Sequence, residues 1–181
     1  MNTHIKQLAR GFALIRKQDN YIKKWHAHLS YKGKNIFLKL HYINFKQWHE
    51  ENKSRRINAT DREIAKAKKN IDSLNYIRSK LVHQIDASLY SHLQHNNKTS
   101  PRNSETPGSI FDRLSILSLK IYHTKLKAEF NKNHRKINNL LQQDRDDLVQ
   151  ALHELMDDLL SGRKQFKLPT CIKFYDECDV S

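Results

Sequence analysis

Glycine and proline are scarce in this sequence, with four Gly and three Pro in 181 residues. An all-β fold needs many tight turns, and these two residues supply much of the special backbone geometry that turns require. Cysteine is equally rare, since Cys171 and Cys178 are the only two, which suits neither a disulfide framework nor a four-ligand zinc site. We therefore expect an all-α protein with reduced thiols, an antiparallel bundle of long helices forming a single domain over residues 1–181.

Long apolar runs are also missing. No stretch reaches the roughly 20 apolar residues that span a bilayer. The first 20 residues, MNTHIKQLARGFALIRKQDN, lack the uninterrupted apolar segment of a signal peptide. We expect no transmembrane segment and a cytoplasmic location. The motifs GxGxxG, HExxH, GxSxG, the Walker loop and paired CxxC are absent as well, which disfavours a motif-defined enzyme.

Acidic residues are few relative to basic ones, and the imbalance is greatest at the start of the chain. The formal net charge is +14, and residues 1–56 contain 13 Lys and Arg against three Asp and Glu. A basic surface attracts phosphate in nucleic acid, anionic lipid or a phosphorylated sugar, although a Lys-rich chain can equally carry such charge as a solvated face. Nucleic-acid binding is not favoured, because neither RNP aromatics nor a helix-turn-helix is recognisable.

Helical periodicity is what the sequence has in abundance. In residues 106–123, Thr106 suits an N-cap and Pro107 the first helical position, and apolar residues then fall on two opposite sides, which predicts an inner helix of a bundle. Other helices are expected from the N-terminus to about Trp25 or Leu29, from Asn35 to about Arg56, and from the capping box at Thr60 to about Leu93. The last helix is expected from about Ile137 to a C-cap at Ser161–Gly162. We expect a mobile polar loop at 94–108 and a break or bend within residues 128–134. The C-terminal tail at 166–181 is expected to be extended and to pack on the bundle through Phe166, Leu168, Ile172 and Phe174.

One face of the helix expected at 35–56 is unusually polar. His41, Asn44, Trp48, Glu51 and Arg55 recur at spacings of three and four residues and therefore form one line along the helix. Such a line can be an ordinary solvated face. The tryptophan in its middle argues instead for a surface that meets something.

An arginine interrupts the apolar seam of the next helix. The seam positions are Ile64, Ala67, Ile71, Leu74, Arg78, Leu81 and Ile85. The guanidinium of Arg78 has to reach water along its stem or find a carboxylate, and Asp112 of the inner helix could face it. Seams of this coiled-coil type also allow a homodimer.

Eleven histidines invite a metal interpretation, especially His26 with His28 and His41 with His49. His-x-His on a helix points its two imidazoles apart, and no carboxylate-x-x-His pair of the di-iron type is present. We expect no metal and no cofactor. For carboxylate chemistry the sequence offers only two groupings, which are Glu50 with Glu51 and Asp72 with Asp112.

Four segments resemble an uncharacterised bacterial all-α family, a domain of unknown function. They are LHYINFKQWHEENKSR (residues 40–55), KKNIDSLNYIRSKLVHQID (68–86), ETPGSIFDRLSILSLKIYH (105–123) and GRKQFKLPTCIKFYD (162–176), and the WHEE-x-x-x-R and TPGSI-x-DRLSIL-x-LKIYH motifs are the most specific. Members are often encoded among genes for lipopolysaccharide assembly and glycosyltransferases, so the resemblance implies a role near envelope glycan synthesis. This chain departs from the family pattern at three places: it has Asn52 where the family has an acid, Ser79–Lys80 where the family has Asn-Asp, and His83 where the family has Glu. These departures remove acidic groups, which puts a metal-dependent pyrophosphohydrolase reaction in doubt.

Helical geometry and the resemblance single out largely the same polar residues. One hypothesis is a pocket for an anionic ligand, phosphate or a nucleotide-sugar, with Arg guanidinium donors and a stacking indole. Its ligand-binding residues would be Trp48, Arg55, Asn75, Arg78 and Arg113. The polar cluster around them would be His26, His41, Asn44, His49, Glu50, Glu51, Asp72 and Asp112. The alternative is a buried ion-pair network that fixes helix register, centred on Asp112 and Arg78.

Three functions remain compatible with the sequence. The first is a non-catalytic accessory or ligand-binding protein in envelope polysaccharide synthesis, beside a glycosyltransferase or another envelope-synthesis protein, in the cytoplasm or at the inner face of the membrane. The second is a small all-α enzyme acting on a phosphorylated sugar or nucleotide, which would need Glu50, Glu51 or Asp72 as a base or metal ligand. The third is nucleic-acid binding through the basic N-terminal helices.

Overall fold

The chain is all-α, as predicted. The computed structural model describes residues 11–28, 31, 33–93, 99–129 and 131–169. The elements are α2 (Gln18–Ala27), α3 (Ile36–Ser54), α4 (Asp61–Leu93), β1 (Arg102–Asn103), α5 (Pro107–Ala128), α6 (Lys132–Leu160) and β2 (Gln165–Phe166). Over these residues, no helix combines the length and the apolar character needed to cross a membrane.

Local sequence explains where several helices begin and end. The side-chain oxygen of Asn35 accepts hydrogen bonds from two backbone N–H groups in the first turn of α3. Before α4, Thr60 and Glu63 form the predicted capping box, in which each side chain accepts from the backbone N–H of the other residue. After α6, Gly162 has a φ of 73°, a left-handed conformation that glycine adopts without strain and that commonly ends a helix.

The start of α5 is fixed both by its own residues and by α4. Thr106 is the N-cap, Pro107 follows it at the first helical position, and the Thr106 hydroxyl accepts from the N–H of Ser109. The Asp86 carboxylate of α4 accepts a hydrogen bond from the Thr106 hydroxyl at 2.6 Å and another from the backbone N–H of Gly108 at 2.7 Å. A buried carboxylate at the positive end of a helix stabilises that end. Asp86 therefore positions α5 on α4.

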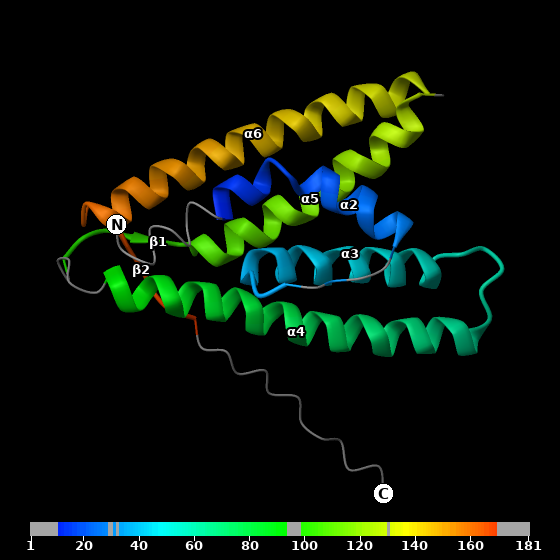
Figure 1. Ribbon diagram of the computed structural model, residues 1–181, viewed down its shortest axis with the longest axis horizontal. Helices are drawn as coiled ribbons and strands as arrows, with labels where there is room; N and C mark the ends of the chain where they lie inside the picture. Colours follow the sequence, from blue (N-terminus) through cyan, green and yellow to red (C-terminus); the bar gives the residue numbers. More distant parts are fainter. Residues whose placement is uncertain (1–10, 29–30, 32, 94–98, 130, 170–181) are drawn as a thin grey trace, which may run out of the picture.

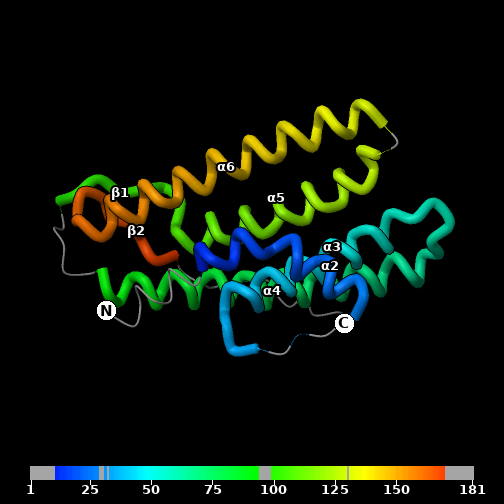
Figure 2. The backbone as a smooth tube through the Cα atoms, turned by 45° about the horizontal axis from the view of Figure 1, so that its top comes forward, coloured from blue at the N-terminus to red at the C-terminus, as the bar shows by residue number. Residues whose placement is uncertain are grey.

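Two helical hairpins and α2 make up the bundle. Figure 1 shows α3 and α4 side by side along one edge and α5 and α6 forming the second hairpin, and the tube in Figure 2 shows the same pairing. Helix α5 contacts α2, α3, α4 and α6, so it is the inner helix that its two apolar sides predicted. The main core joins residues 14 and 15 to α3, α4, α5, α6 and β2. A second apolar cluster lies between α2, α3 and α5 and consists of Ile22, Trp25, Phe45 and Leu119.

The prediction of one continuous N-terminal helix is wrong. Residues 11–15 are helical, residues 16 and 17 form a turn, and α2 begins at Gln18; the part of the prediction before residue 11 lies outside the described residues. The N–H of Lys17 donates to the carbonyl of Leu14 at 2.8 Å, which closes the turn. The buried Gln18 side chain accepts a hydrogen bond from Ser118 of α5 at 2.6 Å. This contact anchors the start of α2 on the inner helix.

The expected break near residues 128–134 is confirmed, because α5 ends at Ala128 and α6 begins at Lys132. The loop predicted at 94–108 ends earlier, because α5 begins at Pro107. Part of the remaining connection is held in place: β1 pairs in parallel with β2, and the Ser100 hydroxyl donates to the carbonyl of Gly162 at 2.6 Å. Of the tail, Phe166 is buried in the main core. Ile172 and Phe174 lie outside the described residues.

Candidate functional site

The polar line on α3 faces the inner helix over its first half. His41 and Asn44 are buried, Trp48 and Glu51 are half-buried, and Arg55 is exposed just after the end of α3. The line therefore runs from the interior to solvent. Its buried half is what α5 covers.

The buried half belongs to a layer of five polar side chains between α3, α4 and α5, which we call the polar layer: His41, Asn44, Arg78, Asp112 and Ser115. The Asn44 amide donates to Asp112 at 2.9 Å and to the Ser115 hydroxyl at 3.0 Å. The Arg78 Nε lies 3.6 Å from the second oxygen of Asp112. Burial raises the pKa of Asp112, and the positive charge of Arg78 and the Asn44 hydrogen bond oppose that rise.

His41 connects the polar layer to α2. Its Nε2 lies 3.3 Å from the carbonyl of Gln18, and its Nδ1 lies 2.7 Å from the Ser115 hydroxyl. A carbonyl can only accept, so Nε2 carries the proton and Nδ1 accepts from Ser115. Burial lowers the pKa of His41 to about 4, although the bond to Gln18 partly opposes the shift, and the imidazole is therefore neutral at pH 7.

Two amide side chains extend the contact between the polar layer and α4: Gln47 of α3 and Asn75 of α4. Gln47 donates to the side-chain oxygen of Asn75 at 3.0 Å, and Arg78 donates to the Gln47 oxygen at 3.4 Å. Sequence reasoning missed Gln18, Gln47, Ser115 and Ser118. The two serines had a signal, because with Asp112 they recur every three residues along α5 and therefore share one side of it.

The three arginines of the predicted anion pocket do not share a carboxylate. Arg78 pairs with Asp112, Arg55 pairs with Glu51 at 2.8 Å, and Arg113 pairs with Glu105 at 2.7 Å. The structure thus brings Asn75 and Arg78 to the polar layer and leaves Arg55 and Arg113 in exposed pairs on other surfaces. Whether any of them binds an anion stays a prediction.

The carboxylates that the enzyme hypothesis needs are likewise dispersed. Glu50 accepts from the ammonium of Lys53 at 2.6 Å and from the Asn70 amide at 2.9 Å, and Asp72 pairs with Lys68 at 2.9 Å. Burial alone would raise the pKa of Glu50, but these two hydrogen bonds and the nearby lysine charge hold it below its usual value. Among the described residues, no acidic side chain belongs to a group of three or more that could hold a metal.

Three histidines from three helices do come together. His26 of α2, His49 of α3 and His123 of α5 place one ligand nitrogen each within 4.8 Å of one another, and we call them the three-histidine cluster. Burial lowers the pKa of all three, to about 4 for His123. Trp48, predicted to offer a stacking face to a ligand, stacks on His123 with ring centroids 4.9 Å apart. One face of the indole is therefore already occupied.

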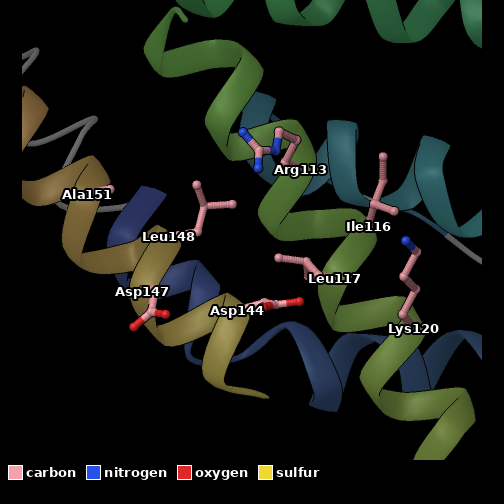
Figure 3. Close-up of a pocket in the computed structure, with 8 residues that line it drawn as sticks. All are labelled: Arg113, Ile116, Leu117, Lys120, Asp144, Asp147, Leu148 and Ala151. Atoms are coloured by element: carbon pink, nitrogen blue, oxygen red, sulfur yellow. The ribbon is translucent and has the colours of Figure 1, made fainter. Parts of the chain in front are cut away.

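An open groove separates part of α5 from α6, and none of the polar-layer residues lines it. Its volume is about 700 Å³, and Figure 3 shows two cations on α5 and two carboxylates on α6 with apolar side chains between them. The lining residues are Arg113, Ile116, Leu117, Lys120, Asp144, Asp147, Leu148 and Ala151. Only Arg113 among them was a predicted site residue.

Comparison with known proteins identifies a family and no individual relative. Neither the curated proteins nor the solved structures provide a match. Residues 34–168 match a family described as "Protein of unknown function (DUF4254)". This region contains three of the four segments that carried the resemblance and part of the fourth, residues 162–176. It covers α3 to β2 and leaves α2 outside. The chain therefore belongs to the DUF4254 family of proteins of unknown function.

Proposed function

We propose that this protein is a non-catalytic accessory protein of envelope polysaccharide synthesis, and that it acts by binding a partner protein in the groove between α5 and α6. The partner class is a glycosyltransferase or another envelope-synthesis protein. The place of action is the cytoplasm or the inner face of the membrane. The groove is the observation that carries the proposal.

The groove has the chemistry of a protein-binding surface. Its floor is apolar, from Ile116, Leu117 and Leu148, and it is open to solvent. None of the ion pairs formed among the described residues involves Lys120, Asp144 or Asp147. An amphipathic helix can bury an apolar stripe in such a groove while its flanking charges pair with both walls.

The apolar surface continues beyond the groove along α6. Ile137 and Leu140 are 48% and 51% exposed, and they precede Asp144 by seven and four residues, on the same side of the helix. Exposed apolar side chains in line with a groove favour an interaction surface. We therefore assign to the partner a helix that runs along α6.

The envelope context rests on the resemblance described above. The family's frequent placement among genes for lipopolysaccharide assembly supports a partner from that pathway. The strongly basic residues 1–56 would favour a location near anionic lipid head groups.

The enzyme alternative receives less support from the geometry. Glu50, Glu51 and Asp72 each pair with a cation three or four residues away, so they do not converge on a shared position for a substrate. An anionic ligand in the polar layer is also disfavoured, because Asp112 already neutralises Arg78 there.

Nucleic-acid binding remains a separate prediction, and retardation of DNA or RNA that weakens steeply with salt would support it.

Site-specific photocrosslinking in the native cell tests the proposal. A photoreactive amino acid replaces Ala151, which is exposed in the groove, and a second variant carries it at Tyr76, which is exposed on α4. We expect position 151, and not position 76, to capture a glycosyltransferase or other envelope-synthesis protein. Identical products at both positions, or none at 151, would contradict the proposal.

A charge-reversal variant makes the test specific. Lys120→Glu with Asp147→Lys inverts both walls of the groove and should reduce the crosslink at least about tenfold, since like charges across an interface are costly. The matched control, Lys66→Glu with Asp72→Lys, inverts two exposed charges on α4 and should leave the yield unchanged.

A further inference from the structure

The three-histidine cluster is built from helices that are distant in sequence. His26 lies in the last turn of α2, His49 in the second half of α3, and His123 in the second half of α5. Their ring centroids are 5.0 Å apart for His26 and His49, 5.2 Å for His26 and His123, and 6.0 Å for His49 and His123. The rings meet edge to face, so parallel stacking does not account for their approach.

Two of these imidazoles have nitrogens that need a partner. Nε2 of His49 and Nε2 of His123 are buried, and neither has a hydrogen-bond partner among the described residues. Leaving a buried polar atom without a partner costs free energy, and such atoms are few in native proteins. An occupant that accepts two or three nitrogen lone pairs would remove this cost.

We propose that His26, His49 and His123 together bind one divalent transition-metal ion, Zn²⁺ by preference, and leave a fourth position for water or an anion. In a tetrahedral site with zinc–nitrogen distances of about 2.0–2.1 Å, the ligand nitrogens are about 3.3 Å apart. The observed limit of 4.8 Å requires a modest contraction. His26 is exposed near the end of its helix and can move toward the other two by rotating its side chain, whereas closing the distance between His49 and His123 needs small rotations of their own side chains.

The donor set selects the class of ion. Three imidazoles without a carboxylate or thiolate suit Zn²⁺, Co²⁺ or Ni²⁺ and do not suit Mg²⁺ or Ca²⁺, which require oxygen ligands. Neutral imidazole is the form that binds a metal, and the lowered pKa values agree with that form. Lys53 and Lys127 add positive charge beside His49 and His123, which favours an anion in the fourth position.

Neighbouring aromatic rings orient two of the ligands. His26 stacks on Tyr122 with centroids 5.4 Å apart, and His123 stacks on Trp48. The sequence had led us to expect no metal, because it offered His26 with His28 on one helix. The folded chain instead selects one histidine from each of three helices. This site is independent of the α5–α6 groove, so the two proposals can be tested separately.

Metal binding to the untagged, full-length, metal-stripped protein tests the inference. Calorimetric titration with Zn²⁺ should give one ion per chain, and Co²⁺ should give the visible absorption bands of a four- or five-coordinate site. His26→Gln, His49→Gln and His123→Gln should each weaken Zn²⁺ binding at least about a hundredfold, because each removes one of three ligands. His26→Gln is informative even if the other two variants fold poorly, since His26 is exposed.

Two controls separate this site from other ligands. His28→Gln changes an exposed histidine two residues from His26 and should bind Zn²⁺ within about twofold of the unaltered protein. Cys171→Ser with Cys178→Ser removes both thiols and should also retain binding. No saturable binding, a loss in the cysteine variant, or unchanged affinity in His26→Gln would overturn the assignment.

Discussion

At the scale of single residues, the centre of this protein is a buried carboxylate with two polar partners. Asp112 receives an amide hydrogen bond from Asn44 and faces the guanidinium of Arg78. Removing one member of such a group leaves the others desolvated and unpaired, and that loss exceeds the net contribution of the intact contact. The polar layer therefore constrains how α3, α4 and α5 meet.

Asp112→Ala should destabilise the protein by about 2–3 kcal/mol, because it leaves the Asn44 amide and Arg78 without their acceptor. Asp112→Asn keeps one acceptor oxygen and should cost about half as much. Urea denaturation at pH 7 measures both. Asp72→Ala, at an exposed carboxylate paired with Lys68, is the matched control and should cost less than about 1 kcal/mol. Equal losses at 112 and 72 would mean that the polar layer does not stabilise the fold.

His41 predicts a dependence of stability on acid pH. Its pKa is about 4 in the folded protein and 6.5 in the unfolded chain, so the unfolded state takes up a proton first as the pH falls. The stabilisation is complete above pH 6.5 and is lost progressively toward pH 4. Between pH 7 and pH 5 this group alone should remove about 2 kcal/mol from the free energy of unfolding.

Comparing the protein with His41→Gln isolates this contribution. Asp86 and Asp112 have pKa values raised by burial and therefore act in the opposite direction, but they are present in both proteins. Denaturation at pH 7 and pH 5, in chelator, should show a smaller acid-induced loss in the variant. The same loss in both would show that His41 does not titrate as its burial requires.

The polar residues illustrate what sequence could and could not predict about the site. A charge in an apolar seam predicted that Arg78 either reaches water or finds a carboxylate, with Asp112 as a candidate, and the structure shows the pair with Asp112. The separation of Arg55 and Arg113 from the polar layer could not be predicted, because helical periodicity shows which residues share one side of a helix and not which neighbouring element covers that side. The three-histidine cluster could not be predicted for the same reason, since its members come from three different helices.

At the scale of helices, the crossing of α4 and α5 depends on a missing side chain. A Cβ at Gly108 would lie 2.7 Å from the Asp86 carboxylate and 2.8 Å from the Val82 carbonyl oxygen of α4. Those distances are shorter than real contacts allow, and the carbonyl belongs to a helix backbone that cannot move alone. Glycine is therefore required for the close approach.

Gly108→Ala should destabilise the protein by about 2 kcal/mol or more through this clash, despite the higher helix propensity of alanine. Thermal unfolding followed by circular dichroism measures the change. Gly33→Ala is the matched control, because its Cβ would lie 3.5 Å or more from the nearest atoms, all in the Tyr31 side chain. If both variants melt together, the close approach at Gly108 does not constrain the crossing.

Helix boundaries were predictable wherever a local chemical signal marks them. Thr106 and Pro107, the Thr60 capping box and Gly162 each act through backbone groups within a few residues, and the structure shows all of them. The turn at residues 16–17 and the pairing of β1 with β2 carry no such signal. Contacts with Ser118 and across the ends of the bundle decide them, and periodicity does not encode those contacts.

At the scale of the whole molecule, the shared core predicts that the chain unfolds as one unit. Buried side chains from residues 14 and 15 and from α3, α4, α5, α6 and β2 form the main core. Helix α5 also belongs to the second cluster, through Leu119. A core shared in this way couples the elements, and small domains with one core commonly unfold in a two-state transition. The single domain that we expected over residues 1–181 should show that behaviour.

Leu152→Ala tests the coupling from the far side of the bundle. Leu152 of α6 is fully buried, so its truncation should cost about 2–5 kcal/mol. Trp25 and Trp48 report on α2 and α3, whereas far-ultraviolet circular dichroism reports on all helices. If the domain is cooperative, the variant shifts the urea midpoints of both signals equally, and the exposed α6 control Glu154→Ala shifts neither. A tryptophan transition that stays in place while circular dichroism is lost earlier would mean that α6 unfolds on its own, and the domain would then consist of two units.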